Sequence, residues 1–180
     1  FEDLLLKYHL DIETVVLWHS LLIEKNLKFN DKYNCAGDAG LFLSVAYLSK
    51  IACVKDVLAK WRIHENSITS TQKKRFIDEE RDIIKKFKIK FQNENKNYEY
   101  ELARWEKRLY LRELFIIWEN EGSPYLIHKV LKSRKFNKYS ISLIFLSLIP
   151  YKIAIYIYKK FKPIWYAKIL NFYDISILII

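Results

Sequence analysis

Two polar groups in the first third of the chain stand at the ends of apolar elements and are of types that can do chemistry. Asp38 lies on a glycine-flanked turn at the predicted start of an apolar helix. Its carboxylate could take a proton as a general base, or it could simply cap the helix. His64 ends a predicted extended segment, where a neutral imidazole could bind a divalent cation or be satisfied by the backbone. Residue type and spacing alone leave both pairs of alternatives open.

The elements that must position these groups alternate between short strands and helices up to residue 67. The β-branched run at residues 14–17 predicts a buried strand, and residues 57–63 predict another strand that leads into His64. Asp38 begins the helix between these strands. The helical spacing of its apolar residues predicts a buried stripe made of Leu41, Val45 and Leu48.

The segments that carry both groups resemble two segments of the family 2 glycosyltransferases, which have the GT-A fold. Residues 36–46, AGDAGLFLSVA, resemble the family's Ala-Glu-Asp-Tyr-Asp-Leu-Phe-Leu-Arg-Ile-Ala pattern, which opens a helix. Residues 58–67, LAKWRIHENS, resemble its Leu-Ala-Lys-Tyr/Trp-Arg-Ile-His-x-x-Ser segment. The resemblance covers residues 1–70 and implies the acceptor-side half of the catalytic domain.

The resemblance also implies a role for three residues. Asp38 would be the catalytic base that deprotonates the acceptor hydroxyl, Arg62 would lie near the donor diphosphate, and His64 would be a late ligand of a divalent metal, Mn²⁺ or Mg²⁺. The parent enzyme would move a sugar from a nucleotide-diphosphate sugar to a hydroxyl of a cell-envelope glycan or lipid-linked precursor. The family's Asp-x-Asp metal motif occurs nowhere in this sequence. The nucleotide-binding half is therefore expected upstream, and this chain alone is expected to be inactive.

Three polar positions of the family pattern are lost around Asp38. The pattern's Glu, Asp and Arg are Gly37, Gly40 and Ser44 here. Losing those charges would alter the pKa of Asp38 and any contact with an acceptor. These departures favour an alternative function, a non-catalytic, membrane-associated helical adaptor derived from a glycosyltransferase.

The rest of the chain predicts long helices, because Gly and Pro are few, at three each. Residues 98–120 predict a helix with Leu102, Trp105 and Leu109 turned inward, and Gly122-Ser123-Pro124 predicts the end of that helix and the start of the next. Residues 70–91 predict a helix with one broad apolar face, made of Phe76, Ile77, Ile83, Ile84, Phe87 and Phe91.

The expected fold class is therefore α/β, mostly helical in this chain, with three parts. Residues 1–68 form the acceptor-side half of a GT-A-like domain, residues 69–121 a helical extension, and residues 122–180 a basic amphipathic tail. The composition, 51% hydrophobic and 29% charged, excludes a disordered chain. Cys35 and Cys53 have no metal-type spacing and are predicted to be reduced thiols in a cytosolic setting.

The formal net charge of +10 is concentrated in the last third of the chain. Residues 121–180 hold ten Lys or Arg against Glu121 and Asp174. A near-neutral body with a basic, apolar tail is typical of binding to a membrane surface, and nothing predicts a groove or stacking platform for nucleic acid. Residues 132–168 are expected to lie on the cytoplasmic face of the cell membrane, or alternatively to pack onto the preceding helices.

Overall fold

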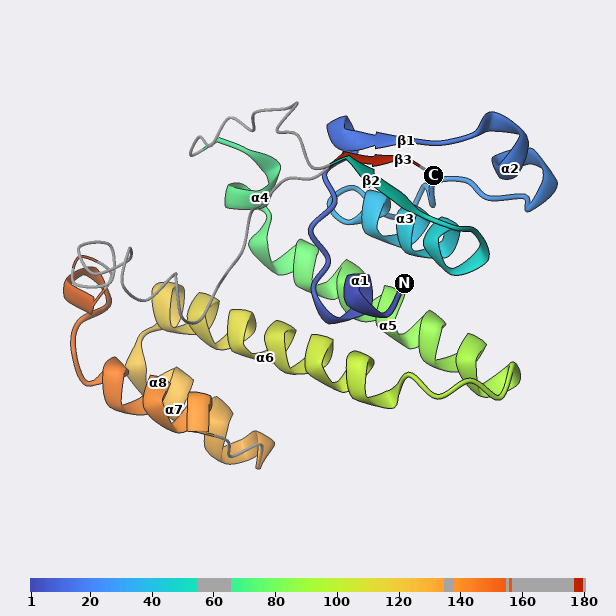
Figure 1. The fold of residues 1–180 in the computed structure, drawn as a ribbon. Coiled ribbons are helices and arrows are strands. Elements are labelled where there is room, and N and C mark those ends of the chain that lie inside the picture. The colour runs from blue at the N-terminus through green and yellow to red at the C-terminus, as the bar shows by residue number, and fades with distance from the viewer. Residues whose placement is uncertain (55–65, 135–137, 155, 157–176, 180) are drawn as a thin grey trace. The chain divides into compact units, whose positions relative to one another are not determined.

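The computed structural model describes residues 1–54, 66–134, 138–154, 156 and 177–179 (Figure 1). These residues are mostly helical, as the sequence predicts. The chain divides into two compact units, Phe1–Glu106 with Tyr173–Ile180, and Lys107–Phe172. This division does not test the three-part organisation expected from the sequence, which stays a prediction.

The first unit holds short helices and strands followed by longer helices. In chain order these are α1 (Glu2–Leu6), a 3-10 turn η1 (Ile12–Thr14), β1 (Val15–Val16), α2 (His19–Glu24), α3 (Gly37–Leu48), β2 (Ala52–Val54), α4 (Ile68–Thr71), α5 (Lys73–Asn93), the first turns of α6 (Glu99–Glu121), and β3 (Ile177–Ile179). The strands have the order β1-β3-β2, and β3 is parallel to β1 and antiparallel to β2. Strands this short do not show the expected α/β half of a GT-A domain, and the strand expected at residues 57–63 lies outside the described residues.

The run at residues 14–17 is not the buried strand that its β-branched side chains predict. Thr14 is buried, but it ends the 3-10 turn, and its hydroxyl donates a hydrogen bond to the carbonyl of Asp11 at 2.8 Å. A side chain that bonds back to its own backbone favours a turn over a strand. The strand is therefore reduced to two residues, and Val16 is 58% exposed.

Helix α3 is buried around most of its circumference. Leu41 and Val45 are buried as predicted, but Leu48 is 41% exposed, so the predicted stripe is wrong at its last position. Phe42, Leu43 and Ala46 are buried as well. A helix that is apolar on nearly all sides is one enclosed by its neighbours, and here the last turn emerges from that enclosure.

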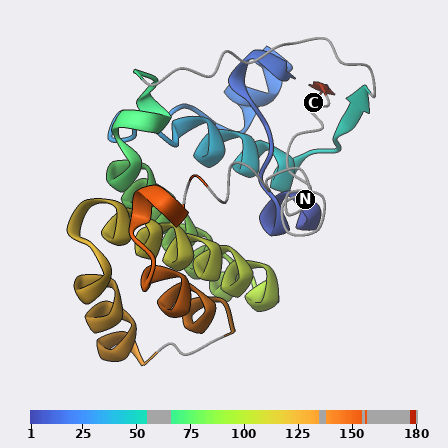
Figure 2. The same cartoon turned by 90° about the vertical axis from the view of Figure 1, so that its left-hand side faces the viewer.

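The predicted apolar faces of α5 and α6 are confirmed. Five of the six predicted residues of α5 are buried and Phe76 is half-buried, while α6 buries Leu102, Trp105 and Leu109. α5 and the first turns of α6 lie side by side (Figures 1 and 2). An ion pair joins Lys88 Nζ to Glu106 Oε1 at 2.6 Å.

The second unit contains the rest of α6, then α7 (Ser123–Ser133) and α8 (Lys138–Ser147). Gly122, with φ of +87°, ends α6, and Pro124 lies in the first turn of α7, as predicted. The core of the unit is made of Tyr110, Leu114, Trp118, Leu126, Val130, Leu143 and Ala154. Within the described ranges, no helix combines the length and the apolar character that crossing a membrane would require.

Candidate functional site

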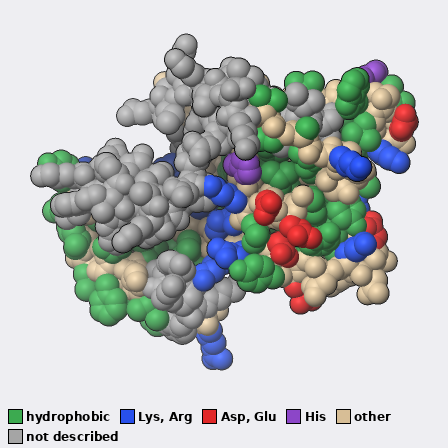
Figure 3. Space-filling view, in the orientation of Figure 1, with side chains coloured by type: hydrophobic (Ala, Val, Ile, Leu, Met, Phe, Trp, Pro, Cys, Tyr) green, Lys and Arg blue, Asp and Glu red, His purple; other side chains and the backbone are tan. Residues whose placement is uncertain are grey.

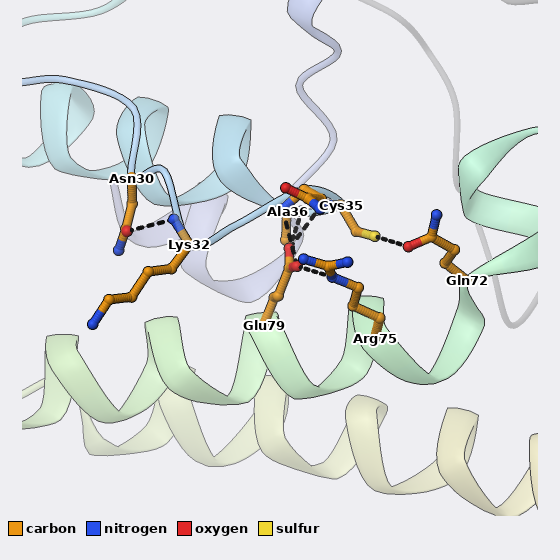
Figure 4. A network of polar contacts seen from close by, with 8 residues as sticks. Asn30, Lys32, Cys35, Ala36, Gln72, Arg75 and Glu79 are labelled. Atoms are coloured by element: carbon orange, nitrogen blue, oxygen red, sulfur yellow. Dashed lines mark hydrogen bonds and ion pairs between the residues drawn. The ribbon is translucent and has the colours of Figure 1, made fainter.

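The N-terminus of α3 is held by a carboxylate from another helix. Glu79 of α5 accepts hydrogen bonds from the backbone N–H groups of Asn34, Cys35 and Ala36, at 3.0, 2.8 and 2.9 Å (Figure 4). Arg75, one turn earlier on α5, donates its Nε–H to Glu79 at 2.9 Å. Because Ala36, the residue before α3, has no side chain that could cap the helix, Glu79 supplies the missing acceptor.

The contacts of Glu79 fix its ionisation state. Burial by itself raises the pKa of the Glu79 carboxyl, but the three backbone N–H groups and Arg75 outweigh it and hold the pKa below its ordinary value. Glu79 is therefore a carboxylate at neutral pH, and its negative charge lies at the positive end of the α3 dipole. This arrangement fixes the turn that carries Asp38.

Asp38 lies in the first turn of α3, partly buried, and its carboxyl is far less acidic than an exposed aspartate. Burial is the main cause, and the nearby Asp11 carboxylate adds to it; together they raise the pKa of Asp38 to about 6. Backbone N–H groups of Ala39 and of Asp38 itself, together with the Tyr8 hydroxyl, act in the opposite direction. Asp38 therefore exchanges its proton near neutral pH.

Tyr8 lies beside Asp38 and is itself in a buried, acidic environment. Burial raises the pKa of the Tyr8 phenol, and the carboxylates of Asp38, Asp11 and Glu80 raise it further, so the phenol keeps its proton. Its hydroxyl affects the pKa of Asp38, yet it makes no hydrogen bond of ordinary geometry to any group in the described part of the chain. Tyr8 is thus a neutral donor held next to the Asp38 carboxyl.

Glu80, the most buried of these acids, is hydrogen-bonded to α6. Glu80 is 5% exposed, and Trp105 Nε1–H donates to its Oε2 at 2.6 Å. Asp11 lies nearer the surface, and burial followed by repulsion from Glu13 raises its pKa. Around α1, whose first turn carries Glu2 and Asp3, Figure 3 shows Asp and Glu side chains gathered on the surface. Tyr8 therefore lies among three acids, Asp11 of the N-terminal segment, Asp38 of α3 and Glu80 of α5.

Asp38 is the predicted site residue that the structure describes. Arg62 and His64 lie outside the described residues, so the expected cleft shared by Asp38 and His64 stays a prediction. Among the residues that the structure describes, no three or more His, Cys, Asp or Glu side chains are grouped so that they could hold a metal ion. Cys35 and Cys53 are free thiols.

Sequence reasoning missed Tyr8, Glu79 and Glu80. The structure buries Glu79 and Glu80. A signal was present, because Glu80 is three residues from both Ile77 and Ile83 and so falls within the apolar face, while Glu79, four residues before Ile83, borders that face. An ionisable residue at such a position must find partners when the helix packs.

A cavity of about 200 Å³ lies between α3, α5 and the loop that precedes α3. Gly37 and Gly40, the two positions at which the pattern compared above has an acid, line it. Its other lining residues are Lys28, Asn30, Tyr33, Leu41, Ser44, Ile83, Lys86, Phe87 and Lys90. Asp38 does not line this cavity, which is therefore separate from the site around Asp38 and Tyr8.

Comparisons of the chain with protein-family models, with curated proteins and with solved structures found no match.

Proposed function

We propose that this chain is the acceptor-side part of a family 2-like glycosyltransferase, in which Asp38 is the general base. The proposal is supported by the pKa of Asp38, about 6. A carboxylate with this pKa is mostly ionised at neutral pH, yet is basic enough to share a proton in a transition state. A solvent-exposed aspartate whose one role is to cap a helix would instead have its pKa lowered by the first-turn N–H groups.

In the proposed reaction the acceptor hydroxyl oxygen attacks the anomeric carbon of the donor, and its proton passes to Asp38. The bond from the anomeric carbon to the diphosphate breaks, and the nucleoside diphosphate leaves. The neutral Tyr8 hydroxyl lies beside Asp38 and lowers the pKa of its carboxyl. A divalent cation, when bound, would neutralise charge on the leaving diphosphate; Arg62 and His64 are the residues of this chain proposed to lie there.

The test uses the longer protein that carries this chain, supplied with a nucleotide-diphosphate sugar and an acceptor. Asp38→Asn should lower turnover by about 10² to 10⁴-fold, the range typical of a general base. The wild-type rate should rise with pH through a limb near 6, because the base must be ionised. Full turnover in Asp38→Asn would exclude the base assignment and favour the non-catalytic adaptor.

Two neighbours of Asp38 provide matched controls with opposite signs. Tyr8→Phe removes a group that lowers the pKa of Asp38, so the limb should move to higher pH. Asp11→Asn removes a charge that raises that pKa, so the limb should move to lower pH. A purely structural role of Asp38 predicts no such paired displacement.

We also propose that residues 132–168 bind the cytoplasmic surface of the cell membrane. The supporting observation is a set of large apolar side chains exposed on α7, on α8 and just after them, including Leu131, Phe145, Leu148, Ile153 and Tyr156. Figure 3 shows hydrophobic side chains reaching the surface over α7 and α8. Exposed apolar surface of this kind usually marks an interaction site.

The charge around this surface favours an anionic membrane. Lys132, Arg134 and Lys152 are exposed within the same stretch, and a basic residue near an anionic leaflet contributes about 1 kcal/mol of binding free energy. The remaining part of the expected membrane segment, residues 157–168, lies outside the described residues. The exposed apolar side chains and the basic residues together predict binding to a membrane surface, and high salt should weaken it because it screens the charges.

Flotation with vesicles tests this second proposal. The chain should float with anionic vesicles and not with zwitterionic ones, and high salt or carbonate should release it. Phe145→Ser with Leu148→Ser should weaken flotation, whereas Ile23→Ser, which changes an exposed residue of the first unit, should not. Carbonate-resistant association would mean that the tail spans the membrane, and no association would mean that it packs onto the protein's own helices.

A further inference from the structure

Three lysines and several apolar side chains line the cavity between α3, α5 and the loop before α3, and no acid is among the described lining residues. Lys28 comes from the loop, and Lys86 and Lys90 come from successive turns of α5. The apolar part of the lining is Leu41, Ile83 and Phe87. A lining that combines lysines with apolar side chains suits a molecule with a charged end and an uncharged body.

The lysines of this cavity are held to different degrees. Lys86 Nζ donates to the Tyr33 hydroxyl at 2.6 Å and pairs with Asp82 at 3.0 Å. Although burial lowers the pKa of Lys86, these two contacts outweigh it and keep the pKa above its ordinary value. Lys86 is therefore a fixed, fully charged group at the wall of the cavity.

The charges of Lys28 and Lys90 are less compensated than the charge of Lys86. Lys90 Nζ lies over the Tyr47 ring, 4.4 Å from its centroid, and Tyr47 donates its hydroxyl proton to Glu94. Within the described residues neither Lys28 nor Lys90 belongs to an ion pair. Asp82, which pairs with Lys86, and Glu94, which accepts the Tyr47 hydroxyl proton, are not among the described residues that line the cavity. The three lysines therefore make the charge of this lining positive.

We propose that this cavity binds the phosphate group of a small organic phosphate through Lys28, Lys86 and Lys90. A phosphate accepts charge-assisted hydrogen bonds from several ammonium groups at once, and a neutral ligand would leave that charge uncompensated. Gly37 and Gly40 add no side chain to the cavity. An acidic side chain at either position would put a negative charge there and would repel a phosphate. The inference does not depend on the glycosyltransferase proposal, since Asp38 takes no part in the site.

The same phosphate chemistry could come from a soluble metabolite or from a lipid headgroup, and the experiment separates the two. The soluble probe is glycerol 3-phosphate, with glycerol as its uncharged control, titrated while the backbone amides of Gly37 and Gly40 are followed by NMR. The lipid probe is phosphatidylcholine vesicles with and without phosphatidic acid. We expect glycerol 3-phosphate to bind at least about tenfold more tightly than glycerol, as one charge-assisted contact would give.

Matched variants connect the binding to this cavity. Lys28→Gln with Lys90→Gln should weaken glycerol 3-phosphate at least about tenfold, because two ammonium donors are lost. Lys85→Gln removes a charge from the same helix outside the cavity and should leave the affinity within about twofold. Equal affinities for glycerol and glycerol 3-phosphate, with no effect of phosphatidic acid, would overturn the proposal.

A second pair of variants guards against loss of folding. A Cβ at Gly40 would stand 3.5 Å from Tyr33 Cε2 and 3.6 Å from Ile83 Cδ1, which are ordinary contacts, so Gly40→Ala should fold and bind. Gly40→Asp should fold but lose binding, because its carboxylate repels the phosphate. Equal binding by these two variants would refute the site. Binding to phosphatidic acid vesicles alone, lost in Lys28→Gln with Lys90→Gln, would identify the phosphate as a lipid's.

Discussion

Removing the Glu79 carboxylate should destabilise the first unit more than any exposed charge does. In Glu79→Ala the N–H groups of residues 34–36 lose their acceptor and Arg75 loses its ion pair. Hydrogen bonds to a charged group contribute about 1.5–3 kcal/mol each but are not additive, and the ion pair with Arg75 adds little because Arg75 is 46% exposed. Because three such hydrogen bonds are lost together, we expect Glu79→Ala to lower the free energy of unfolding by about 3–5 kcal/mol. Glu79→Gln, which keeps one amide oxygen as acceptor, should lower it by about 1.5–3 kcal/mol.

The measurement must report on the first unit by itself. Native-state hydrogen exchange of the amides of Asn34, Cys35 and Ala36 does so, because those N–H groups are the ones that Glu79 protects. Urea unfolding followed by circular dichroism gives the global value. The matched control is Glu106→Gln, which breaks the exposed pair with Lys88 and should cost less than about 1 kcal/mol. If Glu79→Ala cost no more than Glu106→Gln, the hydrogen bonds from residues 34–36 to Glu79 would not stabilise the start of α3.

The pH dependence provides an independent check. The pKa of Glu79 is lowered in the folded state, so its stabilisation is fully present above the ordinary value of 4.5 and is lost as the pH falls through the folded value. The wild-type chain should therefore lose stability in acid over that range. Glu79→Gln should lack this part of the acid transition, and an unchanged acid transition would contradict the assignment.

Four further substitutions have expected outcomes that unfolding and NMR titration can measure. Trp105→Phe removes the indole donor to the buried Glu80 and should cost about 1.5–3 kcal/mol, and a cost under 0.5 kcal/mol would argue against that bond. Gly122→Ala places a side chain at φ of +87° and should cost about 1–3 kcal/mol, whereas Gly40→Ala within helix α3 should not destabilise the chain. Asp38 has a raised pKa, so its ionisation costs stability as the pH rises from 3.8 to about 6, and Asp38→Asn should stabilise the first unit at pH 7 by up to about 3 kcal/mol. A destabilised Asp38→Asn variant at pH 7 would contradict that pKa.

The sequence by itself determined the long helices and the boundary between α6 and α7. The inward positions of α6 and the apolar face of α5 follow from a 3.6-residue period that a few neighbouring residues express. Gly122 and Pro124 ended one helix and started the next because their backbone preferences are properties of single residues. At Val16 the local preference was misleading. The β-branched residues predicted a buried strand, but the Thr14 hydroxyl bonds back to the Asp11 carbonyl and favours a turn, and Val16 is exposed.

Only the tertiary structure decided the chemistry around α3. Glu79 meets the N-terminus of α3 from 43 to 45 residues further along the chain, and Tyr8 reaches Asp38 from the N-terminal segment. Burial and neighbouring charge set the pKa of Asp38, and neither can be obtained from residue spacing, because both depend on which distant segments pack together. The same packing joins three lysines, from two segments of the chain, around one cavity.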